Sequence, residues 1–525
     1  MSRHIKLPAA EGEHIEFKER LIPFVHLKPE RRQQLGTQLK SHLMEGEGVA
    51  VYLLGVSDDG VVVGLSEYEM EMSLSVLSTV AAESGARIRR VERFETEKGL
   101  IARVVIESLP TLAKPHITLA VAGHVNHGKS TLIACLLTNQ PDDGKKWLYL
   151  DTLPHEVERN LSADIHLAVL GLKNGRPVEM SNPLDKLERA RVVEESEKLI
   201  SFVDTVGHEP WLRTTIRGLV GQEVDYGILV VAADDGVTHL TREHLGIMLG
   251  LGIPVIVCVT KKDKVAPSRV VEVRESVSQL LKRVGRVPFL IRENSDIDIV
   301  FDKLGLVVPI LEVSARTLEG FENLYRLLTL LPQRERPLDK PLLLYIDRIY
   351  DIEGVGSVVS GTVRQGRLRA GSDLLLGPYP DGGFKKVKAR SIEIHHARVE
   401  EAVAGYVVGV AVRGVPHSEI RRGMVLCDEE LSPRAVWRFE AEVLVLNNPS
   451  RFAPGYEPVM QCHTISQSVK ILELDREYVK PGEQGSAILE FKYTPMLVQP
   501  QDRFVLREGR TKGIGVIRRI LKYAG

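Results

Sequence analysis

The sequence is poor in the features that mark membrane, secreted and metal-cluster proteins. It has four cysteines among 525 residues, and no two form a Cys-x-x-Cys pair. Metal-site spacing is therefore absent, and reduced, mostly buried thiols are expected. No apolar run approaches the ~20 residues that a membrane helix needs. The N-terminus lacks the apolar central region of a signal peptide. These absences predict a cytoplasmic protein without membrane contact.

Net charge is nearly absent too. Lys and Arg number 69, against 70 for Asp and Glu. This balance excludes a protein that coats nucleic acid with a surface that is basic throughout, but it says nothing about local basic patches. The composition, 43% hydrophobic and 26% charged, is typical of a soluble globular chain. Because a chain of this length exceeds what one hydrophobic core supports, three or four domains are expected.

The first quarter of the chain predicts an N-terminal α+β domain over residues 1–112. Helical patterns cover about residues 29–44 and 67–84. Between them, residues 48–66 indicate two apolar strands joined in a hairpin at Asp58-Asp59-Gly60.

The rest of the chain predicts three further domains. Residues 113–336 alternate apolar strands with helical runs, which is typical of β-α-β units on a mostly parallel sheet. Helical periodicity then disappears, and short Gly-punctuated strands follow one another. They predict two C-terminal antiparallel β-barrels, over residues 337–433 and 434–525.

A phosphate-binding P-loop is predicted at residues 123–130, which spell GHVNHGKS. The stretch follows an apolar strand and opens a helical run, the context in which this pattern binds a nucleoside triphosphate. Backbone N–H groups of the loop would point at the phosphates, Lys129 would reach the β and γ oxygens, and the Ser130 hydroxyl would ligate Mg²⁺. A chance glycine turn before a helix is the alternative.

Three more strand ends supply the other parts of a GTP site. Asp204 ends the strand in FVDTVGHE, placed to hold a magnesium-bound water, and Gly207 would offer its N–H near the γ-phosphate. Asp263, in TKKD, would accept from N1–H and the 2-amino group of guanine, so the wrong base leaves a buried acceptor unpaired. LEVSART at residues 311–317 would close the base site. Ligands bind at the carboxyl ends of such parallel strands.

GHVNHGKST and DTVGHE together resemble the signatures of the translational GTPases, the family of elongation factor Tu. Residues 355–378, 402–427 and 502–517 resemble the second and third domains of that family, so the likeness covers roughly residues 115–525. Within the family, residues 155–162 and 455–472 are most similar to the branch of GTP-binding proteins 1 and 2, relatives of elongation factor 1-alpha.

The resemblance implies a Mg²⁺-dependent GTP hydrolase of protein biosynthesis, stimulated by the ribosome. His208 would position the attacking water, with Val125 and Leu161 as the apolar gate beside it. Delivery of aminoacyl-tRNA or a related RNA to the ribosome by a monomer is the implied role. RNA surveillance, ribosome rescue or mRNA decay is the alternative. A binding module with vestigial hydrolysis and a selenocysteine-type elongation factor are further options.

Three residues depart from the family's pattern. Asn126 replaces Asp, and its amide oxygen would help hold K⁺ against the phosphates or else shape the loop by a hydrogen bond. Ser162 stands where the family offers Thr to Mg²⁺ and the γ-phosphate. Thr260 replaces the Asn that ties the base loop to the phosphate loop.

The predicted site comprises one catalytic residue, His208, and two further groups. The predicted GTP-binding residues are Gly123, His124, Val125, Asn126, His127, Gly128, Lys129, Ser130, Thr131, Asp204, Gly207, Thr260, Lys261, Asp263, Ser314, Ala315 and Arg316. The predicted metal-binding residues are Ser130, Ser162 and, through water, Asp204.

Two segments lie outside these motifs. Residues 172–199 form a polar, charged run that predicts either a solvated insertion or part of a partner surface. HIEFKERL with residues 48–65 resembles the AlbA-like fold of Schlafen-type domains, which implies RNA or partner docking by the N-terminal domain. There Lys28, Arg31, Arg32 and Lys40 would reach RNA phosphate, or would form a solvated helix face.

Overall fold

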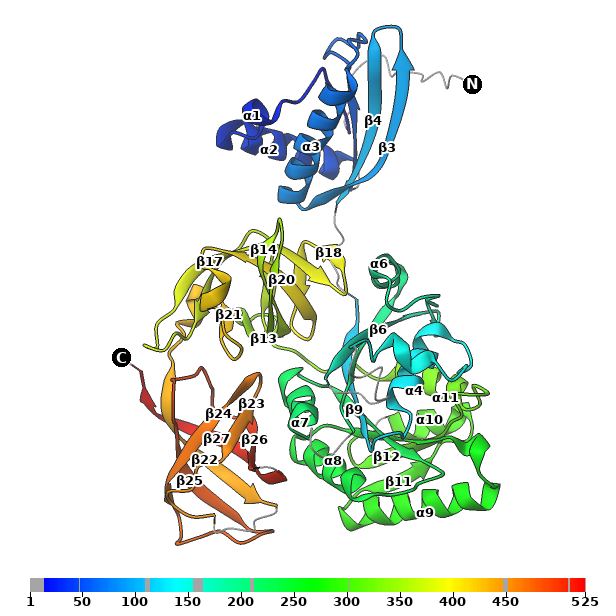
Figure 1. The fold of residues 1–525 in the computed structure, drawn as a ribbon, viewed down its shortest axis with the longest axis vertical. Coiled ribbons are helices and arrows are strands. Elements are labelled where there is room, and N and C mark those ends of the chain that lie inside the picture. The colour runs from blue at the N-terminus through cyan, green and yellow to red at the C-terminus, as the bar shows by residue number, and fades with distance from the viewer. Residues whose placement is uncertain are drawn as a thin grey trace. The chain divides into compact units, whose positions relative to one another are not determined.

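The protein divides into two compact units, Met1–Thr111 and Leu112–Gly525, in a computed structural model. The structure describes residues 14–46, 48–108, 114–153, 164–207, 212–301, 303–446, 452–508 and 510–524. Figure 1 shows the helices and strands of each unit. None of the described helices is both long enough and apolar enough to span a membrane.

The N-terminal unit is a four-stranded sheet, in the strand order β1-β2-β4-β3, with α2 and α3 packed on it and α1 packed against these two helices. The two helices predicted here are confirmed, because local signals start both of them. Pro29 opens α2, and Ser66 with Glu69 forms a capping box at α3. The elements are β1 (Ile15–Lys18), α1 (Pro23–His26), α2 (Pro29–Glu45), β2 (Val49–Leu54), α3 (Glu67–Glu83), β3 (Ala86–Thr96) and β4 (Gly99–Ser108).

The predicted hairpin at Asp58-Asp59-Gly60 is wrong in its second strand. The turn exists, with Gly60 N–H donating to the Ser57 carbonyl at 2.8 Å. However, residues 55–65 form a loop with isolated bridges only, Val56 to Val62 and Leu65 to Leu100. Both edges of β2 are already occupied, by β1 on one side and β4 on the other. No edge is left for a hairpin partner.

The second unit begins with an eight-stranded sheet, in the order β11-β12-β10-β9-β5-β8-β6-β7. Strands β11, β12, β10, β9, β5 and β8 are parallel, and β6 and β7 are antiparallel additions. The strands are β5 (His116–Gly123), β6 (His166–Lys173), β7 (Arg176–Pro177), β8 (Lys198–Asp204), β9 (Tyr226–Ala232), β10 (Val255–Thr260), β11 (Val287–Leu290) and β12 (Val307–Glu312).

Helices cover both faces of this sheet, which is why its central strands are apolar throughout. In β5, Val121 packs on the side of α4 and α11, whereas Ala120 packs on the side of α7, α8 and α9. The predicted β-α-β arrangement is confirmed. The helices are α4 (Lys129–Thr138), α6 (Lys186–Glu195), α7 (Leu212–Gly221), α8 (His239–Gly250), α9 (Pro267–Arg283), α10 (Asn294–Phe301) and α11 (Phe321–Leu330), with short 3₁₀ turns η1 (Lys146–Tyr149) and η3 (Lys262–Lys264).

Two antiparallel β-barrels follow, as predicted. In barrel II a ring of six strands, β16-β21-β13-β14-β20-β17, is closed by the pairing of β16 with β17. Barrel III is the closed ring β22-β25-β24-β23-β26-β27. Closure leaves neither ring with a free sheet edge.

Barrel II contains β13 (Leu343–Ile352), β14 (Gly356–Gln365), β15 (Arg367–Arg369), β16 (Asp373–Gly377), β17 (Lys385–Ile394), β18 (Ala397–Val399), β19 (Glu401–Val403), β20 (Val407–Arg413), β21 (Val425–Cys427) and the 3₁₀ turns η4 (His417–Glu419) and η5 (Glu429–Leu431). Barrel III contains β22 (Val436–Val445), β23 (Val459–Cys462), β24 (Ile465–Leu474), β25 (Gln484–Phe491), β26 (Arg503–Glu508) and β27 (Arg510–Tyr523).

Apolar side chains join the three parts of the second unit. Val193 and Leu199 of the β-α-β domain belong to the core of barrel II, and Tyr345 of barrel II packs into barrel III. Val505 and Ile514 of barrel III pack against the β-α-β domain. The polar run at residues 172–199 is therefore not a solvated insertion, because its helix α6 is packed against barrel II.

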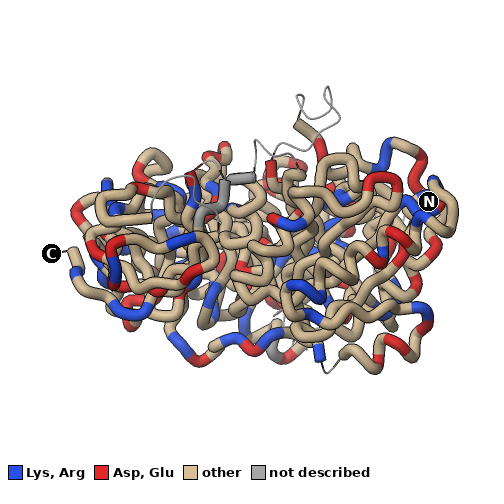
Figure 2. Tube along the Cα trace, turned by 90° about the horizontal axis from the view of Figure 1, so that it is seen from below, with Lys and Arg blue, Asp and Glu red and all other residues tan. Residues whose placement is uncertain are grey.

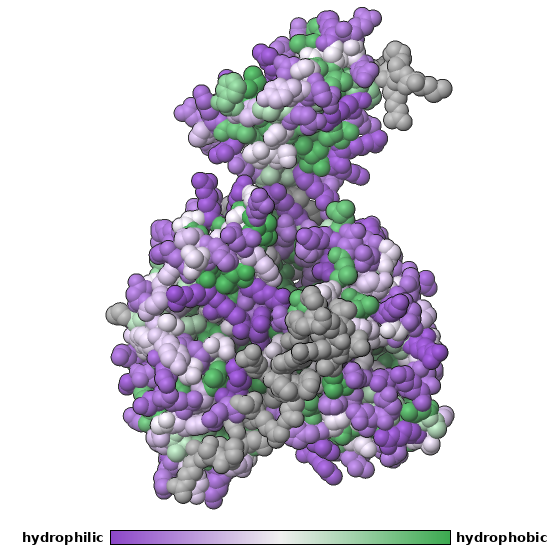
Figure 3. All heavy atoms as spheres, in the orientation of Figure 1, coloured by the Kyte–Doolittle hydropathy of each residue, from purple (hydrophilic) through white to green (hydrophobic). Residues whose placement is uncertain are grey.

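The surface is polar and of mixed charge. Figure 2 shows acidic and basic residues interspersed along the whole trace. On the face seen in Figure 3, the apolar side chains of the second unit lie in small separate groups among hydrophilic ones. The even balance of charge in the sequence is thus also an even distribution in space.

Candidate nucleotide site

A cavity of about 660 Å³ opens where strands β5, β10 and β12 end at their carboxyl termini. Its walls come from the loop between β5 and α4, the loop after β10, the loop after β12 and the segment after α4. This is the edge at which a parallel sheet binds its ligands. A cavity of this volume is large enough for a nucleotide.

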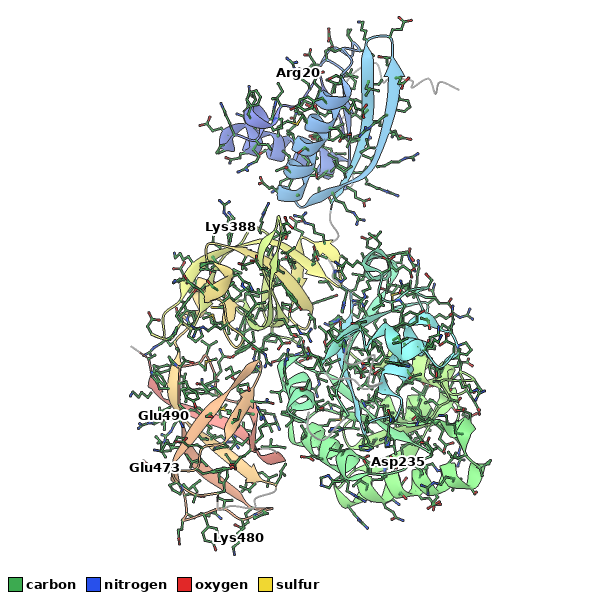
Figure 4. The ribbon with its side chains drawn as sticks, in the orientation of Figure 1. Arg20, Asp235, Lys388, Glu473, Lys480 and Glu490 are labelled. Carbon is green, nitrogen blue, oxygen red and sulfur yellow. The ribbon has the colours of Figure 1, made fainter. Side chains whose placement is uncertain are left out.

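The loop between β5 and α4 is shaped by two left-handed residues. Asn126 has φ 59° and Gly128, the N-cap of α4, has φ 86°. His127 points away from the cavity, with Nδ1 3.2 Å from the Val230 carbonyl and Nε2 2.9 Å from Asp235 Oδ2. Figure 4 labels Asp235 on this domain. The side chain of His127 therefore anchors the loop to the sheet, and its backbone N–H donates to the His124 carbonyl at 3.4 Å. A loop of this kind offers its other backbone N–H groups to an anion.

Lys129 lies at the centre of the cavity wall. Its Nζ donates to the His124 carbonyl at 3.0 Å, and burial lowers its pKa. Gly207 passes so close that a Cβ there would lie 2.3 Å from Lys129 Nζ and 2.7 Å from the Gly123 carbonyl. Only glycine fits at position 207, because the segment after β8 lies directly against the loop between β5 and α4.

Ser130 and Asp204 form the part of the cavity that suits a divalent cation. Ser130 Oγ donates to Asp204 Oδ2 at 2.6 Å. Asp204 Oδ1 is buried without a hydrogen-bond partner in the described part of the chain. Burial, and then the nearby carboxylate of Asp151, raise the pKa of Asp204 to about 6. A cation would balance the charge of the two neighbouring carboxylates and would interact with the unpaired oxygen of Asp204. These residues therefore fit Mg²⁺ held directly by Ser130 and through water by Asp204.

The base end of the cavity is organised around Asp263. Ser314 Oγ donates to Asp263 Oδ1 at 2.7 Å and accepts from Thr317 N–H at 3.2 Å. This hydrogen bond fixes one oxygen of the Asp263 carboxylate. Thr260 Oγ1 donates to the His127 carbonyl at 2.7 Å, so it joins the loop after β10 to the phosphate loop.

Most of the predicted binding residues line one cavity. Those on the wall are Val125, Asn126, Gly128, Lys129, Ser130, Thr131, Gly207, Thr260, Lys261, Asp263, Ala315 and Arg316. The others do not line it. His124, His127, Asp204 and Ser314 are hydrogen-bonded to wall residues, and Gly123 ends β5 just before the loop. The predicted catalytic residue His208, the metal ligand Ser162 and the gate residue Leu161 lie outside the described residues.

Several wall residues were missed by the sequence analysis. Asp142, Asp143 and Trp147 come from the segment after α4, and Asp142 N–H donates to the Ala315 carbonyl at 2.8 Å. Asp151, 4% exposed, is close enough to Asp204 to raise its pKa. The turn signal Asp142-Asp143-Gly144 is visible in the sequence, but nothing there indicates that it faces the base loop.

A second group of buried polar residues has metal-ligand chemistry. Ligand atoms of Cys462, His463 and Asp502 lie within 4.8 Å of one another. However, the Arg364 guanidinium already donates to Asp502 Oδ1 at 2.7 Å and lies 3.1 Å from His463 Nδ1. Glu223 Oε1 is 2.8 Å from the same guanidinium. Arg364 supplies the positive charge that a metal would bring, so this group is an ion-paired cluster.

His463 contributes the second positive charge of that cluster. Burial and Arg364 lower its pKa, but Asp502 and Cys462 raise it more, and the net pKa lies well above the usual 6.5. A protonated His463 and Arg364 balance the carboxylates of Glu223 and Asp502. The cluster joins the three parts of the second unit, because Glu223 follows α7, Arg364 is in barrel II and His463 is in barrel III.

Three family models match the chain in sequence order. The "Elongation factor Tu GTP binding domain" matches residues 114–334, "Elongation factor Tu domain 2" matches residues 356–427, and "Elongation factor Tu C-terminal domain" matches residues 432–521.

Individual proteins with related names are also similar to this chain. GTP-binding protein 1 of Xenopus laevis is 32% identical over 511 residues, which cover 95% of this chain and 78% of that protein. Elongation factor 1-alpha of Pyrococcus furiosus is 30% identical over 457 residues, covering 77% of this chain and 97% of that protein. The fold resembles translation elongation factor SelB of Methanococcus maripaludis in complex with the GTP analogue GppNHp, with a TM-score of 0.58, 21% identity, and 78% and 80% of the two chains covered.

Proposed function

The chain belongs to the elongation factor Tu family of translational GTPases, which bind and hydrolyse GTP, and on this premise we propose that it delivers aminoacyl-tRNA or a related RNA to the ribosome. One observation carries the assignment of the site. The wall of the cavity at the ends of β5, β10 and β12 carries Lys129, Ser130 and Asp263. Ser130 is hydrogen-bonded to Asp204, and Asp263 is hydrogen-bonded to Ser314. Each of these groups of residues would bind a different part of a guanine nucleotide.

The roles of these residues follow from their chemistry. The loop N–H groups and Lys129 bind the β- and γ-phosphates, and Ser130 and Asp204 hold Mg²⁺, directly and through water. Bound Mg²⁺ neutralises the charge that develops between the β- and γ-phosphates. Asp263 accepts from guanine N1–H and the 2-amino group, and Ser314 keeps its carboxylate oriented.

Hydrolysis requires a water held in line with the γ-phosphate. We assign this task to His208 and assign Ser162 to the metal and the γ-phosphate, with Val125 and Leu161 flanking the histidine. Val125 lines the cavity. The ribosome would bring His208 into place, so intrinsic turnover would be slow.

Asn126 has two candidate roles. Its left-handed backbone, φ 59°, supports a role in shaping the loop. Contact of its amide oxygen with K⁺ at the phosphates is the other. GDP dissociation rates measured in KCl, NaCl and choline chloride separate them, since only the second role makes dissociation slower in KCl than in NaCl.

RNA surveillance, ribosome rescue or mRNA decay is the second candidate role. It is favoured by the extra N-terminal unit, where Lys28, Arg31 and Lys40 of the α2 region are exposed. Arg32 differs, because it pairs with Glu83 at 3.1 Å. In this role the N-terminal unit, an RNA- or partner-docking domain, would recruit the decay partner.

Filter binding with labelled tRNA tests the delivery role. The GTP-analogue form should retain aminoacylated tRNA more strongly than deacylated tRNA, and the GDP form should retain neither well. A preference for deacylated or structured RNA, independent of the aminoacyl group, would support surveillance and contradict delivery. Size-exclusion chromatography with light scattering tests the expected monomer.

A further inference from the structure

One segment of the chain runs along the nucleotide cavity from its base end to its metal end. It consists of residues 142–151, which follow α4 and contain η1. At its start, Asp142 N–H donates at 2.8 Å to the carbonyl of Ala315, in the loop that closes the base end. At its end, the carboxylate of Asp151 lies close enough to Asp204 to raise the pKa of that group. The residues between these two ends therefore lie alongside the middle of the cavity.

The middle of the cavity is where the sugar of a bound nucleotide would lie. Because the ribose joins the base to the phosphates, it lies between Asp263 and Lys129 when the base and the phosphates occupy the positions proposed above. The 142–151 segment passes along the wall between those two ends. Its residues on the wall are Asp142, Asp143, Gly144, Trp147 and Asp151.

The two carboxylates at the start of this segment are oriented by the backbone. Asp142 Oδ1 accepts from Gly144 N–H at 3.0 Å, and Asp143 Oδ1 accepts from Lys145 N–H at 2.8 Å. Among the residues that the structure describes, no donor is bonded to the second oxygen of either carboxylate. An ionised carboxylate only accepts hydrogen bonds, and the ribose hydroxyls can donate them. Acidic side chains bind ribose hydroxyls in this way in dinucleotide-binding sheets.

Trp147 is held on the cavity wall by contacts of the turn η1. Leu150, 3% exposed, is part of the core of the β-α-β domain. Lys146 Nζ donates to Gln140 Oε1 at 3.0 Å, and Leu148 N–H donates to the carbonyl of the residue that precedes η1. The partly exposed indole of Trp147 is thus positioned before any ligand binds. Because little ordering is needed on binding, a flat apolar side chain here can pack against a sugar ring at low cost.

We propose that Asp142 and Asp143 bind the 2′ and 3′ hydroxyls of the nucleotide's ribose and that Trp147 packs against the sugar. At neutral pH a guanine nucleotide carries its hydrogen-bond donors in two places, the edge of the guanine and the ribose hydroxyls. Asp263 is assigned to the guanine, so the hydroxyls are the donors that remain for other carboxylates on the wall. The inference rests on the proposed nucleotide site, and it adds selection of ribose over deoxyribose to that site.

The test compares the binding of GDP with that of 2′,3′-dideoxy-GDP, which lacks both hydroxyls, by titration calorimetry. The wild type should bind GDP about 10-fold more tightly or more, because hydrogen bonds to a charged acceptor contribute at least this factor. The double variant Asp142→Asn/Asp143→Asn keeps the oxygens that accept from Gly144 and Lys145 but presents amide donors to the sugar. Its preference for GDP should fall to about 3-fold or less.

The ratio of the two dissociation constants isolates the contact with the sugar. Removing two negative charges near the phosphates raises the affinity for both nucleotides alike, and a disturbed fold lowers both, so neither effect changes the ratio. The control is Glu272→Gln/Glu275→Gln, which removes two exposed carboxylates of α9, away from the cavity wall. It should retain the wild-type ratio.

Trp147 is tested by the rate of nucleotide dissociation. Trp147→Ala should release GDP and 2′,3′-dideoxy-GDP about 5-fold faster, and both to the same extent, because packing on the sugar ring does not need the hydroxyls. Trp147→Phe keeps an aromatic face and should stay within about 2-fold of the wild type.

The outcomes separate this inference from the nucleotide site itself. Absence of GDP binding by the wild type would overturn the nucleotide site and this inference with it. If the wild type binds GDP but binds 2′,3′-dideoxy-GDP equally well, the inference alone is overturned. An unchanged ratio in Asp142→Asn/Asp143→Asn would likewise overturn it for the carboxylates, and an unchanged dissociation rate in Trp147→Ala would overturn it for the indole.

Discussion

The hydroxyl of Thr260 and the backbone carbonyl of His127 lie 2.7 Å apart and join the guanine end of the cavity to its phosphate end. Thr260 is 5% exposed, so the bond is formed away from water. Threonine stands at this position, where the family's pattern has an asparagine that ties the two loops together. The structure shows that a shorter side chain makes the tie through its hydroxyl.

Thr260→Val tests this tie. The variant keeps the shape of the side chain but leaves the His127 carbonyl unpaired, at a cost of about 1 to 2 kcal/mol. GDP affinity should fall roughly 5- to 30-fold, because 1.4 kcal/mol is about tenfold in an equilibrium constant. Stopped-flow dissociation of a fluorescent GDP measures it. Thr260→Ser retains the hydroxyl and should stay within about 3-fold of the wild type; equal loss in both variants would contradict the account.

Base selection should depend on Asp263 and its orientation by Ser314. Asp263→Asn replaces one acceptor oxygen by a donor, so guanine binding should weaken by about 100-fold or more, while xanthine, with a carbonyl at position 2, should gain. Ser314→Ala removes a single hydrogen bond and should weaken GDP binding by about 1 kcal/mol without changing the base preference. Competition between GDP and XDP measures both. Retained guanine preference in Asp263→Asn would remove Asp263 from the base site.

Replacing a single member of the ion-paired cluster should lower the stability of the fold markedly. Arg364→Met leaves the half-buried carboxylate of Glu223 and the buried carboxylate of Asp502 to share the single cation of His463, which should lower the free energy of unfolding by about 3 kcal/mol. Adding Glu223→Gln should restore part of it, because one unpaired charge is removed. Urea unfolding followed by fluorescence measures the differences.

A surface pair provides the matched control for that experiment. Arg438 and Glu490 form an ion pair at 3.0 Å on barrel III, and Figure 4 labels Glu490 there. Arg438→Met should change the free energy of unfolding by less than about 1 kcal/mol. Losses of similar size in Arg364→Met and Arg438→Met would show that the cluster is not a buried unit.

Acid should destabilise the second unit through His116. Its Nε2 lies 2.8 Å from Ser201 Oγ, and that hydroxyl lies 2.7 Å from His395 Nε2 of barrel II. Burial, and then the charge of Arg336, lower the pKa of His116 to about 3. Since the unfolded value is about 6.5, the unfolded chain binds more protons between these two pH values.

The contribution of His116 to stability is therefore present above about pH 6.5 and is lost as the pH falls toward 3. In that window each such histidine adds a slope of about 1.4 kcal/mol per pH unit. His116→Gln should reduce the slope of unfolding free energy against pH by about this amount. His239→Gln, at a side chain 62% exposed, is the control. An unchanged slope in His116→Gln would contradict the buried neutral histidine.

Local signals account for what the sequence predicted correctly. Pro29 and the Ser66–Glu69 capping box start helices by contacts within one turn, so their positions are visible in the chain. The phosphate loop is equally local, since Lys129 and Ser130 follow Gly128 directly. The β-α-β alternation, and the barrels after it, follow from hydrophobic periodicity alone.

What the sequence did not predict depends on contacts between distant segments. Asp151 reaches Asp204 only because β8 lies beside β5, and the four members of the ion-paired cluster come from three domains. The hairpin prediction near Asp58 failed for the same reason, because the place of its second strand is taken by β4.

The most direct test of the central claim is the rate of GTP hydrolysis by the wild type and His208→Ala, each with and without ribosomes. The wild type should hydrolyse GTP slowly alone and much faster with ribosomes. The variant should bind GDP normally yet lose at least about 100-fold of the stimulated rate. Equal rates of the wild type with and without ribosomes, or full stimulation of His208→Ala, would contradict a ribosome-triggered GTPase that works through His208.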